Sequence, residues 1–113
     1  MVKKLPQDEY SERTVLGALL MDSSKAFAGM EALKEEDFCI GNNKIVFKAM
    51  SELYKSKTPI DLTTVSAQLE TMHQLELVGG VEYLSSLTEM VTSFVNLDFY
   101  IDILRNKTTL RKL

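Results

Sequence analysis

The chain has 113 residues, enough for one domain with its own core and too few for a complete multi-domain enzyme. Hydrophobic residues make up 45% of it and charged residues 26%, so neither a disordered chain nor a collagen-like repeat is expected. The net charge is -3 and the two signs are interleaved, so we expect no direct contact with nucleic acid.

The cysteine content and the N-terminal composition indicate a cellular compartment. Cys39 is the single cysteine, so no intramolecular disulfide and no cysteine-based zinc site can form. Residues 1–9 turn acidic before any apolar stretch long enough for a signal peptide, and no window approaches the roughly 18 apolar residues of a membrane span. We therefore expect a cytoplasmic protein that does not contact membranes.

The sequence favours an all-α fold, a compact bundle of about six helices, because it holds only two prolines and five glycines. Asp8 is placed to cap a first helix that runs to about Leu20. Residues 22–24 form a break and a new cap, and a short second helix follows over residues 26–33. Residues 34–37 are predicted to form a solvated bend.

The third predicted helix, residues 42–56, carries apolar side chains over an arc of about 200°, which indicates a central helix packed on several sides. Residues 57–60 form a linker, because Pro59 clashes with a preceding helical turn. Asp61 is then predicted to cap a fourth helix with one apolar face over residues 62–72.

The next segment contains the one double glycine of the chain. Residues 73–78 alternate between polar and apolar types, and Gly79-Gly80 supplies a positive-φ turn or a close backbone approach. A fifth helix with an apolar face follows this pair and ends at Thr92-Ser93.

The final segment, residues 94–113, has two apolar stripes on opposite sides of a helix. The stripe predicted to join the core is Leu97, Tyr100, Ile101 and Leu104. The opposite stripe needs a second surface, because exposed apolar patches of that size mark interaction sites. We predict that this protein-interaction stripe consists of Val95, Phe99, Ile103 and Leu110, with Leu113 on the same side. No Gly, Asn or Pro terminates the helix, so we expect it to continue in a longer parent chain.

No catalytic, cofactor-binding or metal-binding residue is predicted. The phosphate-binding loop G-x-x-x-x-G-K-[ST] is absent from the sequence. His73 could act as a general base with Glu70 or Glu76, but an exposed histidine at a helix end is the favoured interpretation. Cys39 is interpreted as a small buried hydrophobic residue, and residues 35–37 as a solvated turn in preference to a metal site.

Five runs of the sequence, in order and covering nearly the whole chain, resemble a known family. They are Glu12-Arg13-Thr14-Val15-Leu16-Gly17-Ala18-Leu19-Leu20-Met21-Asp22, Asp37-Phe38, Pro59-Ile60-Asp61-Leu62, Val78-Gly79-Gly80 with Tyr83-Leu84, and Asn96-Leu97 with Tyr100. Together they resemble the N-terminal domain of the DnaB-type bacterial replicative DNA helicase.

The resemblance implies a non-catalytic domain of a hexameric helicase. It implies an N-terminal tail over residues 1–8, a globular head over residues 9–93, and a last helix over residues 94–113 that leads toward a helical hairpin and a RecA-like ATPase domain outside this sequence. ATP and magnesium would bind in that motor domain. The implied partners are further copies of the chain, primase and a helicase loader.

Three alternatives remain open at this stage. The first is the helicase-binding C-terminal domain of primase, which has a similar fold. The second is a generic helical interaction module, and the third is a small enzyme that uses His73.

Overall fold

The computed structural model describes residues 8–91 and 96–113, and within these ranges all regular structure is helical. The elements are α1 (Glu9–Met21), α2 (Ser23–Ala32), the 3₁₀ turn η1 (Glu35–Asp37), α3 (Gly41–Lys55), α4 (Leu62–Thr71), α5 (Leu75–Val78), α6 (Gly80–Glu89) and α7 (Leu97–Arg111). The all-α prediction is confirmed. The described part has one α-helix more than the expected six or so, because α5 is a single turn and too short to show helical periodicity.

Side-chain caps begin several helices where the sequence predicts them. The Asp8 carboxylate accepts a hydrogen bond from the Ser11 N–H at 3.0 Å, and Asp22 caps α2 in the same way. Asp61 and Thr64 exchange two backbone-to-side-chain hydrogen bonds of 2.9 Å each at the start of α4. These oxygens satisfy N–H groups that have no partner within the helix.

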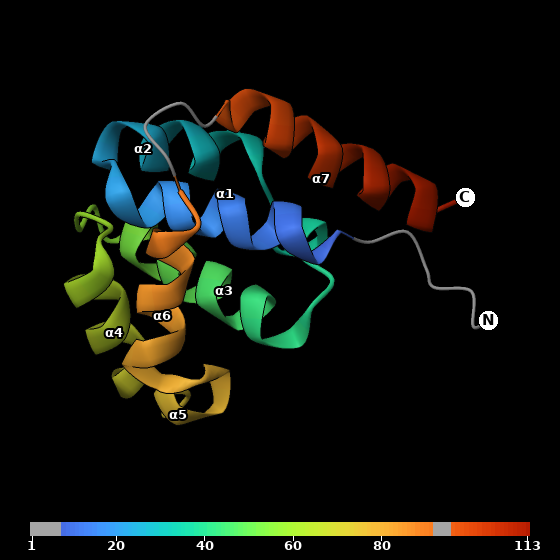
Figure 1. The fold of residues 1–113 in the computed structure, drawn as a ribbon. Coiled ribbons are helices and arrows are strands. Elements are labelled where there is room, and N and C mark those ends of the chain that lie inside the picture. Colours follow the sequence, from blue (N-terminus) through green and yellow to red (C-terminus); the bar gives the residue numbers. More distant parts are fainter. Residues whose placement is uncertain (1–7, 92–95) are drawn as a thin grey trace.

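Helix α1 forms the centre of the bundle. Figure 1 shows it running between α2 and α7 on one side and α3 and α6 on the other, and it packs against all four. Nine of its 13 residues are buried, with Val15, Leu16 and Leu19 fully enclosed. The wide apolar arc predicted for residues 42–56 is also covered by neighbouring elements, since α3 contacts α1, α2, α4, α5 and η1. The most enclosed helix is nevertheless α1.

Gly17 lets α1 and α6 approach at backbone distance. A Cβ atom built on Gly17 would lie 2.1 Å from the carbonyl oxygen of Leu87, a distance that no side chain can tolerate. The absence of a Cβ at this position therefore sets how closely the two helices pack.

The double glycine makes the corner between α5 and α6. Gly79 has a φ of 117° and Gly80 a φ of 72°, both in the region that disfavours side chains. The predicted positive-φ turn is confirmed, and it forms the corner between the two helices.

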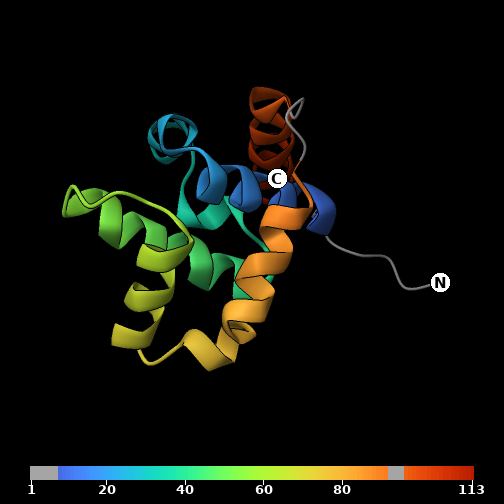
Figure 2. The same ribbon diagram turned by 60° about the vertical axis from the view of Figure 1, so that its left-hand side comes forward.

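Helix α7 lies along the outside of the bundle in both ribbon views (Figures 1 and 2), against α1, α2 and η1. It begins at Leu97, where the Asn96 side chain accepts a hydrogen bond from the Phe99 N–H at 3.1 Å. The predicted helix end at Thr92-Ser93 falls outside the described residues. Within the described ranges, no helix is long and apolar enough to cross a membrane.

Candidate functional site

One face of α7 belongs to the core. Leu97, Ile101 and Leu104 are buried, and Tyr100 packs against the same cluster with its ring partly exposed. This stripe is the one predicted to dock on the rest of the domain, and the prediction is confirmed. It fixes which side of α7 remains available to a partner.

The opposite face of α7 is apolar and exposed. Phe99 is 57% exposed and Leu110 50%, while Ile103 between them is partly exposed. We call these three residues the α7 outer face, since helical geometry places them within about 40° of one another. Val95, the fourth predicted interaction residue, lies outside the described residues. Leu113, on the same side, is 93% exposed.

Aromatic rings extend this surface onto α1. The Phe99 ring meets the Tyr100 ring edge-on, with centroids 5.3 Å apart, and Tyr100 lies 6.2 Å from the ring of Tyr10. Tyr10 is itself 57% exposed. Sequence reasoning did not single out Tyr10, because its place beside α7 depends on how the two helices pack.

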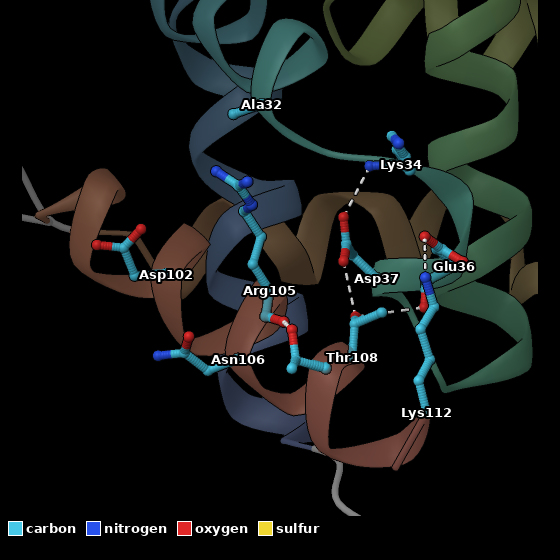
Figure 3. Close-up of a pocket in the computed structure, with 10 residues that line it drawn as sticks. Ala32, Lys34, Glu36, Asp37, Asp102, Arg105, Asn106, Thr108 and Lys112 are labelled. Atoms are coloured by element: carbon cyan, nitrogen blue, oxygen red, sulfur yellow. Dashed lines mark hydrogen bonds and ion pairs between the residues drawn. The ribbon is translucent and has the colours of Figure 1, made fainter.

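Polar contacts fix the C-terminal half of α7 to η1 (Figure 3). The Thr108 hydroxyl donates a hydrogen bond to the Asp37 carboxylate at 2.7 Å, and the Lys34 N–H donates to the same carboxylate at 2.8 Å. Arg111 donates to the carbonyl oxygen of Glu36 at 2.9 Å. The orientation of α7 is therefore set by specific hydrogen bonds as well as by core packing.

The solvated bend predicted for residues 34–37 is wrong for Asp37. Its side chain is buried, because α7 covers it and supplies a hydroxyl donor from 71 positions further along the chain. Glu35 and Glu36 are exposed as expected. The Lys112 ammonium donates a hydrogen bond of 2.9 Å to Glu36 and lowers the pKa of that carboxyl below its usual value.

A polar hollow of about 300 Å³ lies between η1, the end of α2 and α7 (Figure 3). Acidic and basic side chains both line it. They include Asp37 and Asp102 as well as Lys34 and Arg105. Because these charges balance, the hollow has no clear preference for an anion or a cation. Among the described residues, no group of three or more His, Cys, Asp or Glu could hold a metal ion.

Glu12 is a buried carboxylate that caps another helix. It accepts hydrogen bonds from the N–H groups of Cys39 at 2.7 Å and Ile40 at 3.2 Å, just before α3, and from the Asn43 side chain at 3.0 Å. Ile40, the N-cap of α3, has no capping side chain of its own, so Glu12 on α1 takes that role. Asn43 in turn accepts a hydrogen bond from the Tyr83 hydroxyl, which joins α6 to the network.

Sequence reasoning missed this network although one signal was present. Glu12 lies three and four residues before Val15 and Leu16, on the buried side of α1. A carboxylate at core spacing must find hydrogen-bond donors. Its partners come 27 to 31 residues later, however, and no local pattern identifies them.

Two other residues considered for chemistry are His73 and Cys39. His73 is exposed and has a φ of 58° at the end of α4, where its N–H donates to the Glu70 carbonyl and the Gln74 N–H donates to the Leu69 carbonyl. This pair of hydrogen bonds is the Schellman pattern of a helix C-terminus. Among the described residues, no hydrogen bond or ion pair joins the His73 side chain to a carboxylate. Cys39 is partly buried in the loop before α3.

Known proteins are similar to this chain in sequence and in fold. Residues 4–106 match the family model described as the DnaB-like helicase N terminal domain. The replicative DNA helicase DnaB of Geobacillus stearothermophilus is 38% identical over 108 residues, which cover 96% of this chain and 24% of that protein. The replicative DNA helicase DnaC of Bacillus subtilis (strain 168) is 33% identical over 108 residues, which again cover 96% of this chain and 24% of that protein.

A solved structure agrees in three dimensions. The N-terminal domain of DnaB helicase from Mycobacterium tuberculosis superimposes with a TM-score of 0.91 and 33% identity, over 97% of this chain and 76% of that chain. The present chain spans about a quarter of the length of the curated relatives it matches. From its sequence, its fold and these matches, the chain belongs to the family of DnaB-like helicase N-terminal domains.

Proposed function

We propose that this domain is the non-catalytic assembly and docking part of a hexameric replicative DNA helicase. In this proposal it forms a collar that supports the helicase ring, and it docks primase during DNA replication. A helicase loader is a further proposed partner. ATP-dependent unwinding, with ATP and magnesium, belongs to a motor domain outside the present sequence, and DNA is not a direct ligand of this domain.

The observation that carries the proposal is the α7 outer face. Phe99, Ile103 and Leu110 remain accessible on a helix whose other side is fully committed to the core. An accessible apolar stripe held on a rigid helix is typical of a surface that pairs with another protein. The aromatic contacts of Phe99 with Tyr100 and of Tyr100 with Tyr10 widen that stripe toward α1.

The size of this stripe predicts weak pairing. Full burial of one large apolar side chain contributes about 1.5 to 3 kcal/mol. Covering the exposed halves of the three side chains therefore contributes about 2 to 5 kcal/mol in total. Association itself costs at least about 4 kcal/mol in lost motional freedom. A standard interface also buries about 800 Å² on each partner, more than one stripe supplies. We therefore expect at most weak self-association of residues 1–113 through this stripe alone.

The family assignment separates this proposal from the alternatives. A helicase-binding domain of primase and a generic adaptor both predict a helical bundle. Neither predicts a match to the helicase N-terminal family over residues 4–106. An enzyme that uses His73 draws no support from an exposed imidazole without a carboxylate partner among the described residues.

The test is sedimentation velocity across a concentration series, with the chain alone and with the C-terminal domain of the cognate primase. The variant Phe99→Asp/Ile103→Asp is expected to weaken self-association, primase binding or both by at least about tenfold. A matched control is Thr63→Asp/Ala67→Asp, which places two aspartates with the same spacing on exposed positions of α4. Circular dichroism checks that each variant is folded.

If the α7 variant and the control behave alike, the α7 outer face is not the interface. If the double variant does not fold, the single variant Phe99→Asp tests the most exposed position of the α7 outer face without changing the partly buried Ile103. Unchanged binding by this folded single variant would also reject the proposal.

A further inference from the structure

A basic and partly apolar segment precedes α1. Residues 1–7 hold Lys3, Lys4 and no acidic residue, in a chain whose net charge is -3. Leu5 follows the two lysines directly, and the segment ends at Asp8, the first residue that the structure describes. A surface that complements this segment must offer carboxylates beside exposed apolar side chains.

The N-terminal half of α7 offers that combination. Phe99 is 57% exposed and Ile103 is partly exposed, as described for the α7 outer face. Asp98 and Asp102 are also exposed, and among the described residues no ion pair joins either of them to a cation. Helical geometry places both carboxylates on one flank of the outer face, about 60° to 100° from Phe99. We call Asp98 and Asp102 the acidic flank.

The cations near the acidic flank do not neutralise it. Arg105 lies three positions after Asp102, but its guanidinium reaches toward Ala32 at the end of α2 (Figure 3). No salt bridge joins Arg105 to Asp102 among the described residues. Figure 3 places Lys34 on the far side of the polar hollow. The two carboxylates against one arginine leave a net charge of about -1 on this flank.

The start of α1 lies close enough for the segment to cross α7. Figures 1 and 2 both place the first turn of α1 beside α7, and the ring of Tyr10 lies 6.2 Å from that of Tyr100. Tyr100 lies on the flank of the outer face opposite to the acidic flank. An extended chain spans about 3.3 Å per residue, so from Asp8 the reach is about 10 Å for Leu5 and about 17 Å for Lys3. A helix with its side chains is about 10 to 12 Å wide, so the segment is long enough to cross it.

We propose that residues 1–7 cross the α7 outer face of their own chain as a strap. In this arrangement Leu5 covers Phe99 and Ile103, and the two lysines that precede it pair with the acidic flank. The order of residues fits the path, because the chain meets the apolar ridge before it meets the carboxylates. The inference rests on the proposed function for its consequence, since a partner must displace the strap to reach the same apolar side chains.

The strap is expected to weaken partner binding by about two- to fivefold. A short tether gives an effective concentration in the millimolar range, and exposed ion pairs with one leucine make a weak contact. The covered and uncovered states are therefore comparable in population. The apparent dissociation constant equals the intrinsic one divided by the uncovered fraction, so an uncovered fraction of about one-half to one-fifth gives this range.

The direct test is an NMR experiment on the whole chain, residues 1–113, at low salt. We expect nuclear Overhauser effects between the Leu5 methyl protons and the ring protons of Phe99. A mixed sample of labelled and unlabelled chains should show none of these effects between different chains. Absence of the Leu5–Phe99 effects, or their appearance between chains, would overturn the strap.

Charge reversal tests the pairing with the acidic flank. Lys3→Glu/Lys4→Glu should remove the Leu5–Phe99 effects. The matched control Lys48→Glu/Lys55→Glu changes two exposed lysines of α3, across the bundle from α7, and should preserve them. Adding Asp98→Lys/Asp102→Lys to the first variant should restore the effects. Failure of this restoration, or an equal loss in the control, would refute the assigned pairing.

The consequence for binding is measured by sedimentation velocity with the C-terminal domain of the cognate primase. Leu5→Asp should tighten binding about two- to fivefold. The control Leu77→Asp makes the same change on a leucine of α5 that is 69% exposed, and it should not tighten binding. If Phe99→Asp leaves binding unchanged, the proposed function fails, whereas the strap is still decided by the Leu5–Phe99 effects. If Phe99→Asp weakens binding but Leu5→Asp behaves like its control, the strap does not regulate this face.

Discussion

Replacement of Glu12 gives the sharpest test of how this domain is held together. The carboxylate accepts three hydrogen bonds, from Cys39, Ile40 and Asn43, and its side chain is 1% exposed. A hydrogen bond to a charged group contributes about 1.5 to 3 kcal/mol, and a buried donor left without a partner costs about 1 to 3 kcal/mol. Asn43 is fully buried, while Cys39 and Ile40 are only partly so, and water can satisfy their N–H groups in part.

We therefore expect Glu12→Ala to lower the free energy of unfolding by about 3 to 5 kcal/mol. Glu12→Gln keeps one acceptor oxygen but turns an NH₂ group toward a donor, so we expect a loss of about 2 to 3 kcal/mol. A domain of this size has a total stability of about 5 to 15 kcal/mol. The loss is thus a large share of the total.

Urea unfolding at pH 7, followed by far-ultraviolet circular dichroism, measures these losses through the shift of the midpoint. The control Glu70→Gln makes the same chemical change at an exposed position of α4 and should alter stability by less than about 0.5 kcal/mol. A loss below about 1 kcal/mol for Glu12→Ala would show that the network does not carry the stability we assign to it.

Two further predictions concern helix ends. His73→Gly should raise the free energy of unfolding by about 1 kcal/mol, because glycine adopts the φ of 58° at this position without strain. Urea unfolding measures the gain in the free energy of unfolding. An equal gain in His73→Ala, which keeps the Cβ atom, would show that relief of backbone strain is not its cause. Asp22 has a pKa below its usual 3.8, chiefly because the Ser24 hydroxyl donates a hydrogen bond of 2.7 Å to its carboxylate. A lowered pKa means that the stability from Asp22 is present above pH 3.8 and is lost as the pH falls through the folded-state pKa. Ser24→Ala should move this pKa back toward 3.8, as an NMR titration of the Asp22 carboxyl carbon would show, and an unmoved pKa would exclude the hydroxyl as its cause.

Local patterns predicted the helices and their buried faces well. The aspartates before α1, α2 and α4 are caps, since a capping bond joins residues only two or three positions apart. The two sides of α7 also followed from the sequence. Leu104 is buried and Phe99 exposed, because helical periodicity alone places them on different faces.

Sequence periodicity separated the two faces of α7, but it could not identify α1, α2 and η1 as the elements that cover the inner one. It also gave no sign of an apolar groove of about 700 Å³, whose walls come from α2, the end of α3 and the following linker. Phe27 had the spacing of a core residue in its helix and is nevertheless exposed. Whether such a side chain is covered depends on the neighbouring helices.

The sequence by itself determined the all-α class, the helix caps, the glycine corner and the resemblance to a helicase N-terminal domain, because each depends on residues close together in the chain or on their order. Only the tertiary structure decided that Glu12 caps α3 and that Asp37 is buried under Thr108. The physical reason is distance along the chain. Asp37 and Thr108 are 71 positions apart, and such a hydrogen bond exists only once core packing has brought their helices together.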